Sequence, residues 1–201
     1  MAAACLFFAQ DPDVRVAAQR GDVGSIVGAD ISSVQAAEDR GVKYSDGGVS
    51  KDILEILRDH GFNYIRLRVF NDPTKPTPRD RPYGGDNAAT RRFVDAALGQ
   101  RVAFDVLGQS CYTRWQGQPA GWKANFDDLA ARYPTLSFVV AEVGFEVKEA
   151  MEVMRSLPDG RGLGTFVWEP TSNLNGQSLF DGSGAVIPEK MAVYDELTRR
   201  R

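Results

Sequence analysis

Two periodicities of apolar residues alternate along this chain. Short apolar or strictly alternating runs predict five strands, at residues 25–31, 63–70, 102–107, 136–141 and 162–168. Segments with apolar positions three or four apart predict helices, at residues 50–60, 87–99, 120–132, 146–157 and 188–199. This alternation of strand and helix predicts an α/β fold with parallel strands, in which ligands bind at the carboxyl ends of the strands.

The helix predicted at residues 50–60 has the clearest boundaries. Its apolar residues form one stripe opposite the charged ones, Ser50 occupies the capping position, and Gly61 stops the helix. His60, the only histidine, falls at the helix C-terminus, where it is favourably placed against the helix dipole. We therefore interpret His60 as a structural residue.

The second predicted strand is not followed directly by a helix. Residues 71–85 contain four prolines and two glycines, so no regular element persists there. A closed (β/α)8 barrel needs eight strands and about 250 residues, whereas this chain has 201 residues and five predicted strands. The pattern therefore predicts about five β/α units, fewer than a closed barrel needs.

Composition and charge argue against several classes of function. A net charge of −3 and a pI near 5.3 give no field that would attract nucleic acid or an anionic membrane surface. Cys5 and Cys111 lie far apart and match neither a disulfide framework nor a metal-ligand spacing, so we expect both to be free. A single histidine also disfavours Ser-His, Cys-His and histidine-rich metal chemistry. We expect neither a metal nor a cofactor.

Residues 1–24 form a segment that precedes the first predicted strand. Its apolar stretch, Met1–Ala9, is too short to span a bilayer. It has no Lys or Arg before the apolar part and a weak small-residue cleavage pattern around Ala9, so we interpret it as a candidate signal-peptide remnant. Residues 25–201 then form one partial barrel domain.

Polar and aromatic side chains gather where the predicted strands end. In a parallel β/α protein, this rim is where loops leave the sheet and side chains meet the ligand. The rim residues are Asp30, Arg66, Arg68, Gln109, Tyr112, Glu142, Trp168 and Glu169. This combination of aromatic, amide and charged groups indicates a sugar-binding site.

Arg66 and Arg68 are two residues apart and therefore share one face of their strand. Ile65, Leu67 and Val69 are expected to face the helices. Arginines that point into a barrel need carboxylate partners, and they can hold a nucleophilic carboxylate ionised. For either arginine, a buried ion-pair network without a catalytic role is the alternative.

Two glutamates are candidates for glycoside hydrolysis, which uses a pair of carboxyl groups, about 5–5.5 Å apart in retaining enzymes. Glu142 closes an otherwise apolar strand, and Glu169 follows Trp168 after the last strand. A structural carboxylate paired with an arginine is the alternative for Glu142. The indole of Trp168 offers either a stacking face for a sugar ring or a core-filling side chain.

Several motifs together resemble glycoside hydrolase family 53, the arabinogalactan endo-β-1,4-galactanases. They are GADIS (28–32), KDILEILRDHGFNYIRLRVFNDP (51–73), FDVLGQSCY (104–112), VVAEV (139–143) and VWEP (167–170). The resemblance covers about residues 25–200 and implies a (β/α)8 barrel with a retaining glycosidase mechanism.

The resemblance also implies roles for individual residues. Glu142 falls on the position of the nucleophilic glutamate at the end of strand 7. The positions that look like the family's substrate-site residues are Asp30, Arg66, Tyr112 and Trp168, and we add Arg68 to this predicted substrate-binding set.

The sequence departs from the family pattern in its middle. The family's strand 3 carries a histidine motif, and its strand 4 ends in the Asn-Glu that supplies the acid/base; this chain has no Asn-Glu dipeptide and no second histidine. After RPYG, the sequence resembles the stretch between family strands 5 and 6. We therefore expect an internal deletion that covers about strands 3 to 5, with the join near residues 83–86. The resemblance thus implies an α/β fold of the (β/α)8 TIM-barrel type, truncated to about five β/α units.

We expect a secreted or extracytoplasmic glycosidase of the endo-β-1,4-galactanase type that acts on galactan or arabinogalactan. Its activity should be impaired because the acid/base is absent, and Glu169 is the candidate substitute. The alternatives are a catalytically inactive carbohydrate-binding remnant and a non-functional deletion product. We expect no nucleic acid or membrane partner, and we expect self-association through exposed sheet edges.

Overall fold

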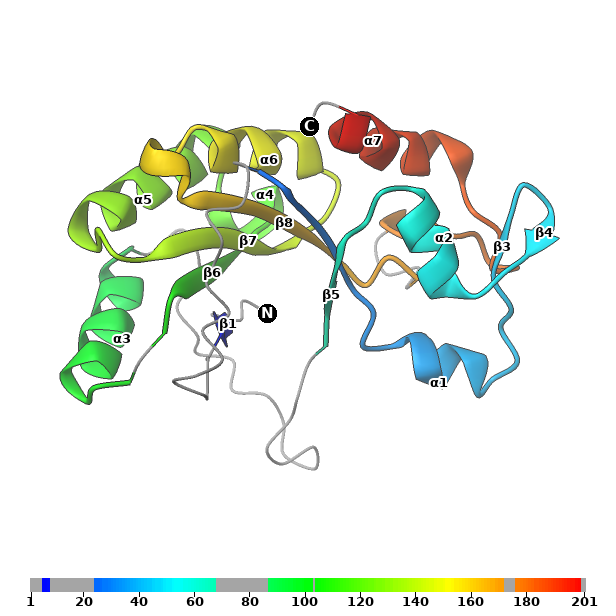
Figure 1. Ribbon diagram of the computed structural model, residues 1–201, viewed down its shortest axis with the longest axis horizontal. Helices are drawn as coiled ribbons and strands as arrows, with labels where there is room; N and C mark the ends of the chain where they lie inside the picture. Colours follow the sequence, from blue (N-terminus) through cyan, green and yellow to red (C-terminus); the bar gives the residue numbers. More distant parts are fainter. Residues whose placement is uncertain (1–4, 8–23, 68–86, 103, 172–175, 200–201) are drawn as a thin grey trace. The chain divides into compact units, whose positions relative to one another are not determined.

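Strands and helices alternate along the chain in the computed structural model (Figure 1), which describes residues 5–7, 24–67, 87–102, 104–171 and 176–199. The five predicted strands are present as β2 (Ile26–Asp30), β5 (Tyr64–Arg66), β6 (Val106–Cys111), β7 (Ser137–Val143) and β8 (Gly162–Trp168). The predicted helices are α2 (Ile53–Asp59), α3 (Asn87–Gly99), α5 (Pro119–Arg132), α6 (Val147–Arg155) and α7 (Pro188–Arg199).

Several short elements were not predicted. They are β1 (Cys5–Phe7), α1 (Val34–Glu38), the ribbon of β3 (Ser45–Asp46) and β4 (Val49–Ser50), α4 (Thr113–Gln116) and the 3-10 turn η1 (Pro158–Gly160). None of the helices in the described part of the chain is long and apolar enough to cross a membrane.

The chain divides into two compact units. The first unit contains residues 1–25 and 72–165, and the second contains residues 26–71 and 166–201. β8 therefore contributes its residues up to Thr165 to the first unit and its residues from Phe166 to the second.

In the first unit, β6 and β7 pair in parallel, and β1 pairs antiparallel with β6. The start of β8 follows β7, since the Phe138 N–H donates to the Arg161 carbonyl at 2.7 Å. α6 packs on β7, and α5 packs against both α6 and α3. All residues of β7 from Phe138 to Val143 are buried, which is typical of a parallel strand with both faces covered.

The pairing of β6 with β7 shifts by one residue close to the strand ends. Gln109 is opposite Val140, but Ser110 is opposite Glu142. Ala141 therefore has no residue of its own opposite it on β6, which is the arrangement of a β-bulge.

In the second unit, β2 and β5 pair in parallel, with Asp30 opposite Arg66. A Cβ atom at Gly28 of β2 would overlap the buried ring of Phe166, so the strand needs glycine at that point. α7 packs on β2, and the rings of Phe62 and Tyr194 stack at 4.8 Å.

The predicted strand at residues 102–107 was wrong by four residues, because β6 begins at Val106 and ends at Cys111. The prediction followed the apolar residues, whereas the strand continues through Gln109 and Ser110. These polar residues are held there by backbone pairing with apolar β7, and both are buried. Gln109 consequently lies inside the strand, where its Nε2 donates to Thr90 Oγ1 at 3.0 Å, and not at the rim.

The predicted cap of α2 was also wrong. Asp52 is the N-cap, and its carboxylate accepts the Leu54 N–H at 2.7 Å. Ser50 pairs with Ser45 in the β3–β4 ribbon, so it is not available at the helix end. His60 caps the C-terminus of α2, which confirms its predicted position.

The apolar face of β5 differs from the prediction. Ile65 is 43% exposed and Leu67 is 64% exposed, so neither side chain is covered by helices. Within the second unit, α2 packs on β3 and α7 packs on β2. Arg68, Val69 and the predicted join at residues 83–86 lie outside the described residues.

Candidate active site

Glu142 lies in β7, one residue before the strand ends, and its exposed fraction is 5%. Its neighbours along the strand are apolar and buried, and Ser110 of β6 is opposite it. A carboxylate on a buried strand sits on rigid backbone and is shielded from bulk water. Both properties suit a nucleophile that must be held in one orientation.

The loop after β6 brings Tyr112 to the same end of the first unit's strands. Tyr112 is 5% exposed, and its backbone N–H donates to Gln116 Oε1 at 2.8 Å, which holds the short helix α4 against the end of β6. Trp122 is 1% exposed, and its Nε1 donates to the Gln116 carbonyl at 3.1 Å, so it is a packing residue of α5.

Two exposed aromatic side chains follow β6 and β7. Trp115 is 50% exposed and meets Tyr112 edge to face at 5.3 Å between ring centroids, with the Arg114 guanidinium 5.5 Å from the Trp115 ring. Phe145 is 61% exposed, two residues after β7 ends. Phe145 lies in the loop after a predicted strand, and this position could have indicated it from the sequence.

Thr113 and Glu146 join the two loops. The Thr113 hydroxyl donates to the Glu146 carboxylate, and Glu146 is the residue before α6. The loops that follow β6 and β7 are therefore tied together at the carboxyl ends of these two strands. No sequence pattern singled out this pair, since the two residues are 33 positions apart.

In the second unit, the strand ends hold a buried ion pair. Arg66 Nη1 donates to Asp30 Oδ2 at 2.6 Å, with Asp30 0% and Arg66 6% exposed. The other Asp30 oxygen accepts the Ser32 N–H at 3.0 Å and the Ser32 hydroxyl at 2.6 Å. The prediction that Arg66 needs a carboxylate partner is confirmed.

The end of β8 carries Trp168 and Glu169. Trp168 is half-buried, and Glu169 is 5% exposed with a φ angle of 50°, in the left-handed region. The Ser33 hydroxyl donates to the Glu169 carboxylate. Sequence reasoning did not identify Ser33, although it directly follows the GADIS motif.

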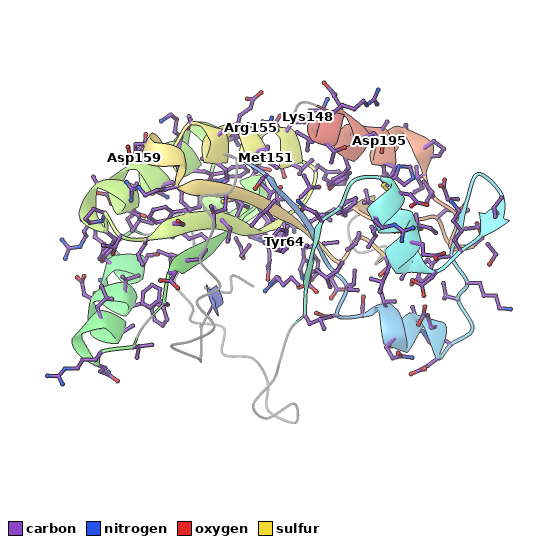
Figure 2. The ribbon with its side chains drawn as sticks, viewed as in Figure 1. Tyr64, Lys148, Met151, Arg155, Asp159 and Asp195 are labelled. Carbon is purple, nitrogen blue, oxygen red and sulfur yellow. The ribbon has the colours of Figure 1, made fainter. Side chains whose placement is uncertain are left out.

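His60 links three elements of the second unit. Its Nδ1 is 2.7 Å from Asp195 Oδ1 of α7, which is labelled in Figure 2, and its Nε2 is 3.5 Å from Asp46 Oδ2 of β3. Lys51 also faces this group, 3.9 Å from Asp46. These contacts support the structural role predicted for His60.

The described residues contain neither a cluster of metal ligands nor a reactive thiol. Among them, no three His, Cys, Asp or Glu side chains lie together in a way that could hold a metal ion. Cys111 is a free, buried thiol, and burial, together with the charge of Glu146, raises its pKa. It is therefore protonated and shielded at neutral pH.

The predicted site residues fall in both units. Glu142 and Tyr112 belong to the first unit, and Asp30, Arg66, Trp168 and Glu169 belong to the second. Carboxylates, an arginine and aromatic rings at the carboxyl ends of β-strands, each followed by helices, are typical of glycosidases with a β/α-barrel type of fold.

Comparison with known sequences agrees with this class. The sequence pattern of glycosyl hydrolase family 53 matches residues 26–84. The endo-beta-1,4-galactanase of Bacillus subtilis is 28% identical over 170 residues, which cover 80% of this chain and 39% of that protein. A probable arabinogalactan endo-beta-1,4-galactanase A of Neosartorya fischeri is 34% identical over 102 residues, which cover 49% of this chain and 27% of that protein.

A solved structure has the same type of fold. The GH53 catalytic domain of Ignisphaera aggregans superimposes with a TM-score of 0.63 and 18% identity, over 88% of this chain and 96% of that domain. The fold class and the resemblance to glycoside hydrolase family 53 that the sequence predicted are therefore confirmed. The chain spans well under half the length of the two galactanases named above.

Proposed function

We propose that this protein is a glycosidase that acts on β-1,4-galactan through Glu142 as the nucleophile of a retaining mechanism. The observation that carries the proposal is the burial of Glu142 near the end of β7, where the strand is buried from Phe138 to Val143 and otherwise apolar over that stretch. In that mechanism, the carboxylate attacks the anomeric carbon and forms a glycosyl-enzyme, which water then hydrolyses.

The proposal includes impaired turnover, because the motif that would supply the acid/base is missing. The family pattern matches residues 26–84 and stops at the join proposed for the internal deletion, and this supports a loss of the intervening strands. General acid assistance contributes about 10²- to 10⁴-fold to the rate. Glu169, which is buried directly after β8, is the proposed substitute for the missing acid/base.

The substrate-binding set in this proposal is Asp30, Arg66, Arg68, Tyr112 and Trp168. The exposed ring of Trp115 adds a flat apolar face, on which a sugar ring can stack. Galactan and arabinogalactan are the substrates after which the two similar galactanases are named, and we propose them for this protein. Such polysaccharides lie outside the cytoplasm, and we propose a secreted or extracytoplasmic location for this protein.

We further propose that the protein associates with itself through the exposed edge of β5. Tyr64, labelled in Figure 2, is 51% exposed, and it is followed by the exposed Ile65 and Leu67. A strand edge with three large apolar side chains favours pairing with a second strand.

The proposal can be tested with two substrates whose leaving groups differ in their need for a proton donor. Galactan oligosaccharides release an alkoxide and need an acid, whereas a 2,4-dinitrophenyl β-galactobioside releases a stable phenolate and does not. We expect slow release of reducing sugar from galactan but clear release of dinitrophenolate. The activated substrate should be cleaved at least about 10²-fold faster.

The variants Glu142→Gln and Glu169→Gln separate the alternatives. Loss of dinitrophenolate release in Glu142→Gln supports the nucleophile. If Glu169→Gln loses galactan cleavage but keeps dinitrophenolate release, Glu169 is supported as the substitute acid. Binding of galactan without cleavage of either substrate identifies a carbohydrate-binding remnant, and neither binding nor cleavage identifies a product without this function.

A further inference from the structure

Ser33 stands at the start of a helix without capping it. It is the residue before α1, and it makes no side-chain hydrogen bond to the first turn of that helix. Serine is favoured at this position because its oxygen normally accepts a backbone N–H of the first turn. Here the hydroxyl donates instead to the Glu169 carboxylate, 136 residues away.

Glu169 has the backbone conformation that needs such support. Of the described non-glycine residues, Arg101, Asp159 and Glu169 have positive φ, and Glu169 is the buried one, with φ 50°. The left-handed region is disfavoured for residues with a side chain and persists when the surroundings hold it. The turn at Glu169 sets the direction in which the chain leaves β8, directly after Trp168.

The residue before Ser33 is held by the end of β2. Asp30 binds the backbone N–H and the hydroxyl of Ser32 with one oxygen, and it binds Arg66 with the other. These contacts fix the turn that carries Ser33. The backbone from Ser32 to Ser33 therefore connects the ion pair at β2 and β5 with the hydrogen bond to Glu169 after the end of β8, within the second unit.

We propose that Ser33 is a positioning residue, whose hydroxyl holds the Glu169 carboxylate and thereby fixes Trp168 for stacking on a galactose ring. The sugar-binding part of this inference rests on the proposed function. The positioning part does not, because the Ser33–Glu169 contact and the conformation of Glu169 are properties of the protein alone.

Fluorine NMR of protein labelled with 5-fluorotryptophan tests the positioning. The three tryptophans give three signals, and Trp168→Phe assigns one of them. We expect Ser33→Ala to shift or broaden the Trp168 signal and to leave the Trp122 signal of the first unit unchanged. Ser33→Thr keeps the hydroxyl and should restore the Trp168 signal.

Ser183→Ala is the matched control, because it also removes a serine-to-carboxylate hydrogen bond in the second unit, to Asp181 at 2.6 Å. It should leave all three signals in place. A Trp168 signal that is the same in Ser33→Ala as in the unaltered protein, or one that Ser183→Ala moves equally, would overturn the inference. If Ser33→Ala does not fold, Glu169→Gln keeps the length of the side chain, weakens the same bond from its other end and carries the same test.

Affinity for galactotetraose tests the sugar-binding part. We expect Ser33→Ala to weaken binding by about 10-fold, the size of one hydrogen bond to a charged group, and Ser33→Thr to recover it. Unchanged affinity despite a moved Trp168 signal would overturn the link to stacking. If the unaltered protein does not bind galactotetraose, the proposed function fails, whereas the NMR result still decides the role of Ser33.

Discussion

Asp30 and Arg66 face one another on neighbouring parallel strands, and both are buried. Buried charges are tolerated when they are paired and when their remaining hydrogen-bonding groups are satisfied. Asp30 meets this condition through Ser32 as well as Arg66. The pair therefore fixes the relative position of the ends of β2 and β5, whether or not it also contacts a ligand.

Removal of one member of the Asp30–Arg66 pair should destabilise the folded protein. We expect Arg66→Met to lower the free energy of unfolding by about 3–5 kcal/mol, because it leaves the Asp30 carboxylate buried without its guanidinium. Urea denaturation followed by circular dichroism measures this change. The double variant Asp30→Leu/Arg66→Met should lose less than the sum of the single variants, and strict additivity would contradict the coupling.

Cys111 should be inert in the folded protein. Its side chain is 1% exposed, and burial raises the pKa of the thiol, so little thiolate forms at pH 8. In a Cys5→Ser background, we expect no reaction of Cys111 with 5,5′-dithiobis(2-nitrobenzoate) until urea unfolds the protein. Rapid reaction under native conditions would show that the end of β6 opens.

At the scale of elements, the end of α5 is held by a residue from another part of the chain. Arg161 donates to three backbone carbonyls, of Ala130 at 2.9 Å, Tyr133 at 3.1 Å and Leu136 at 3.2 Å. These carbonyls lie at and beyond the helix C-terminus, where backbone acceptors have no partner in the helix. Arg161 thereby joins α5 to the start of β8.

Arg161→Ala should expose how much this contact contributes. We expect the free energy of unfolding to fall by about 2 kcal/mol, because hydrogen bonds from a charged donor contribute about 1.5–3 kcal/mol and water replaces part of them. Arg58→Ala is the control, since its side chain is 70% exposed. Equal effects of the two substitutions would contradict the capping role of Arg161.

The contact between α3 and α5 should depend on pH. The hydrogen bond from Arg132, followed by that from Tyr133, lowers the pKa of Asp95 below its usual value. As the pH falls, the Asp95 carboxylate is therefore protonated first in the unfolded chain, at about pH 4. The contribution of Asp95 to the stability of the folded protein is present above that pH, and it is lost as the pH falls through the lower pKa of the folded state.

We expect Asp95→Asn to reduce the thermal midpoint at pH 6 and to make it less sensitive to acid between about pH 5 and pH 3. Scanning calorimetry at several pH values measures this. Parallel curves for the two proteins over the whole range would show that Asp95 does not contribute.

The elements show why some features could be predicted and others could not. α3 and α5 follow apolar periodicity and end at helix-stopping residues, so their predicted bounds were correct within a residue. β6 was misplaced because Gln109 and Ser110 are polar residues in a buried strand, and their position depends on pairing with β7. Cross-chain contacts such as Ser33 with Glu169 leave no local pattern at all.

At the scale of the whole molecule, the described residues include five of the strands that a β/α-barrel type of fold uses, and each overlaps a predicted strand, although β6 lies four residues later than predicted. The sequence also predicted the family resemblance, because its motifs coincide with the strands and with α2. It did not predict β1, which pairs antiparallel with the edge of β6. Three residues are too few for a periodicity to be detected.

Self-association should depend on the exposed residues of β5. We expect the double variant Ile65→Lys/Leu67→Lys to lower the weight-average sedimentation coefficient at high protein concentration, because charges on a strand edge oppose pairing. Val49→Lys, at an exposed apolar residue of β4, is the control. A coefficient that does not depend on concentration in the unaltered protein would refute the proposal.

The unpaired Ala141 has a consequence for how this protein can vary. One extra residue on β7 reverses which side of the strand the following side chains occupy, because the two sides alternate residue by residue. The side of the strand on which Glu142 lies thus depends on the number of residues before it in β7 as much as on their chemistry. Deleting Ala141 would conserve every functional group of the protein and still turn this carboxylate toward the opposite side.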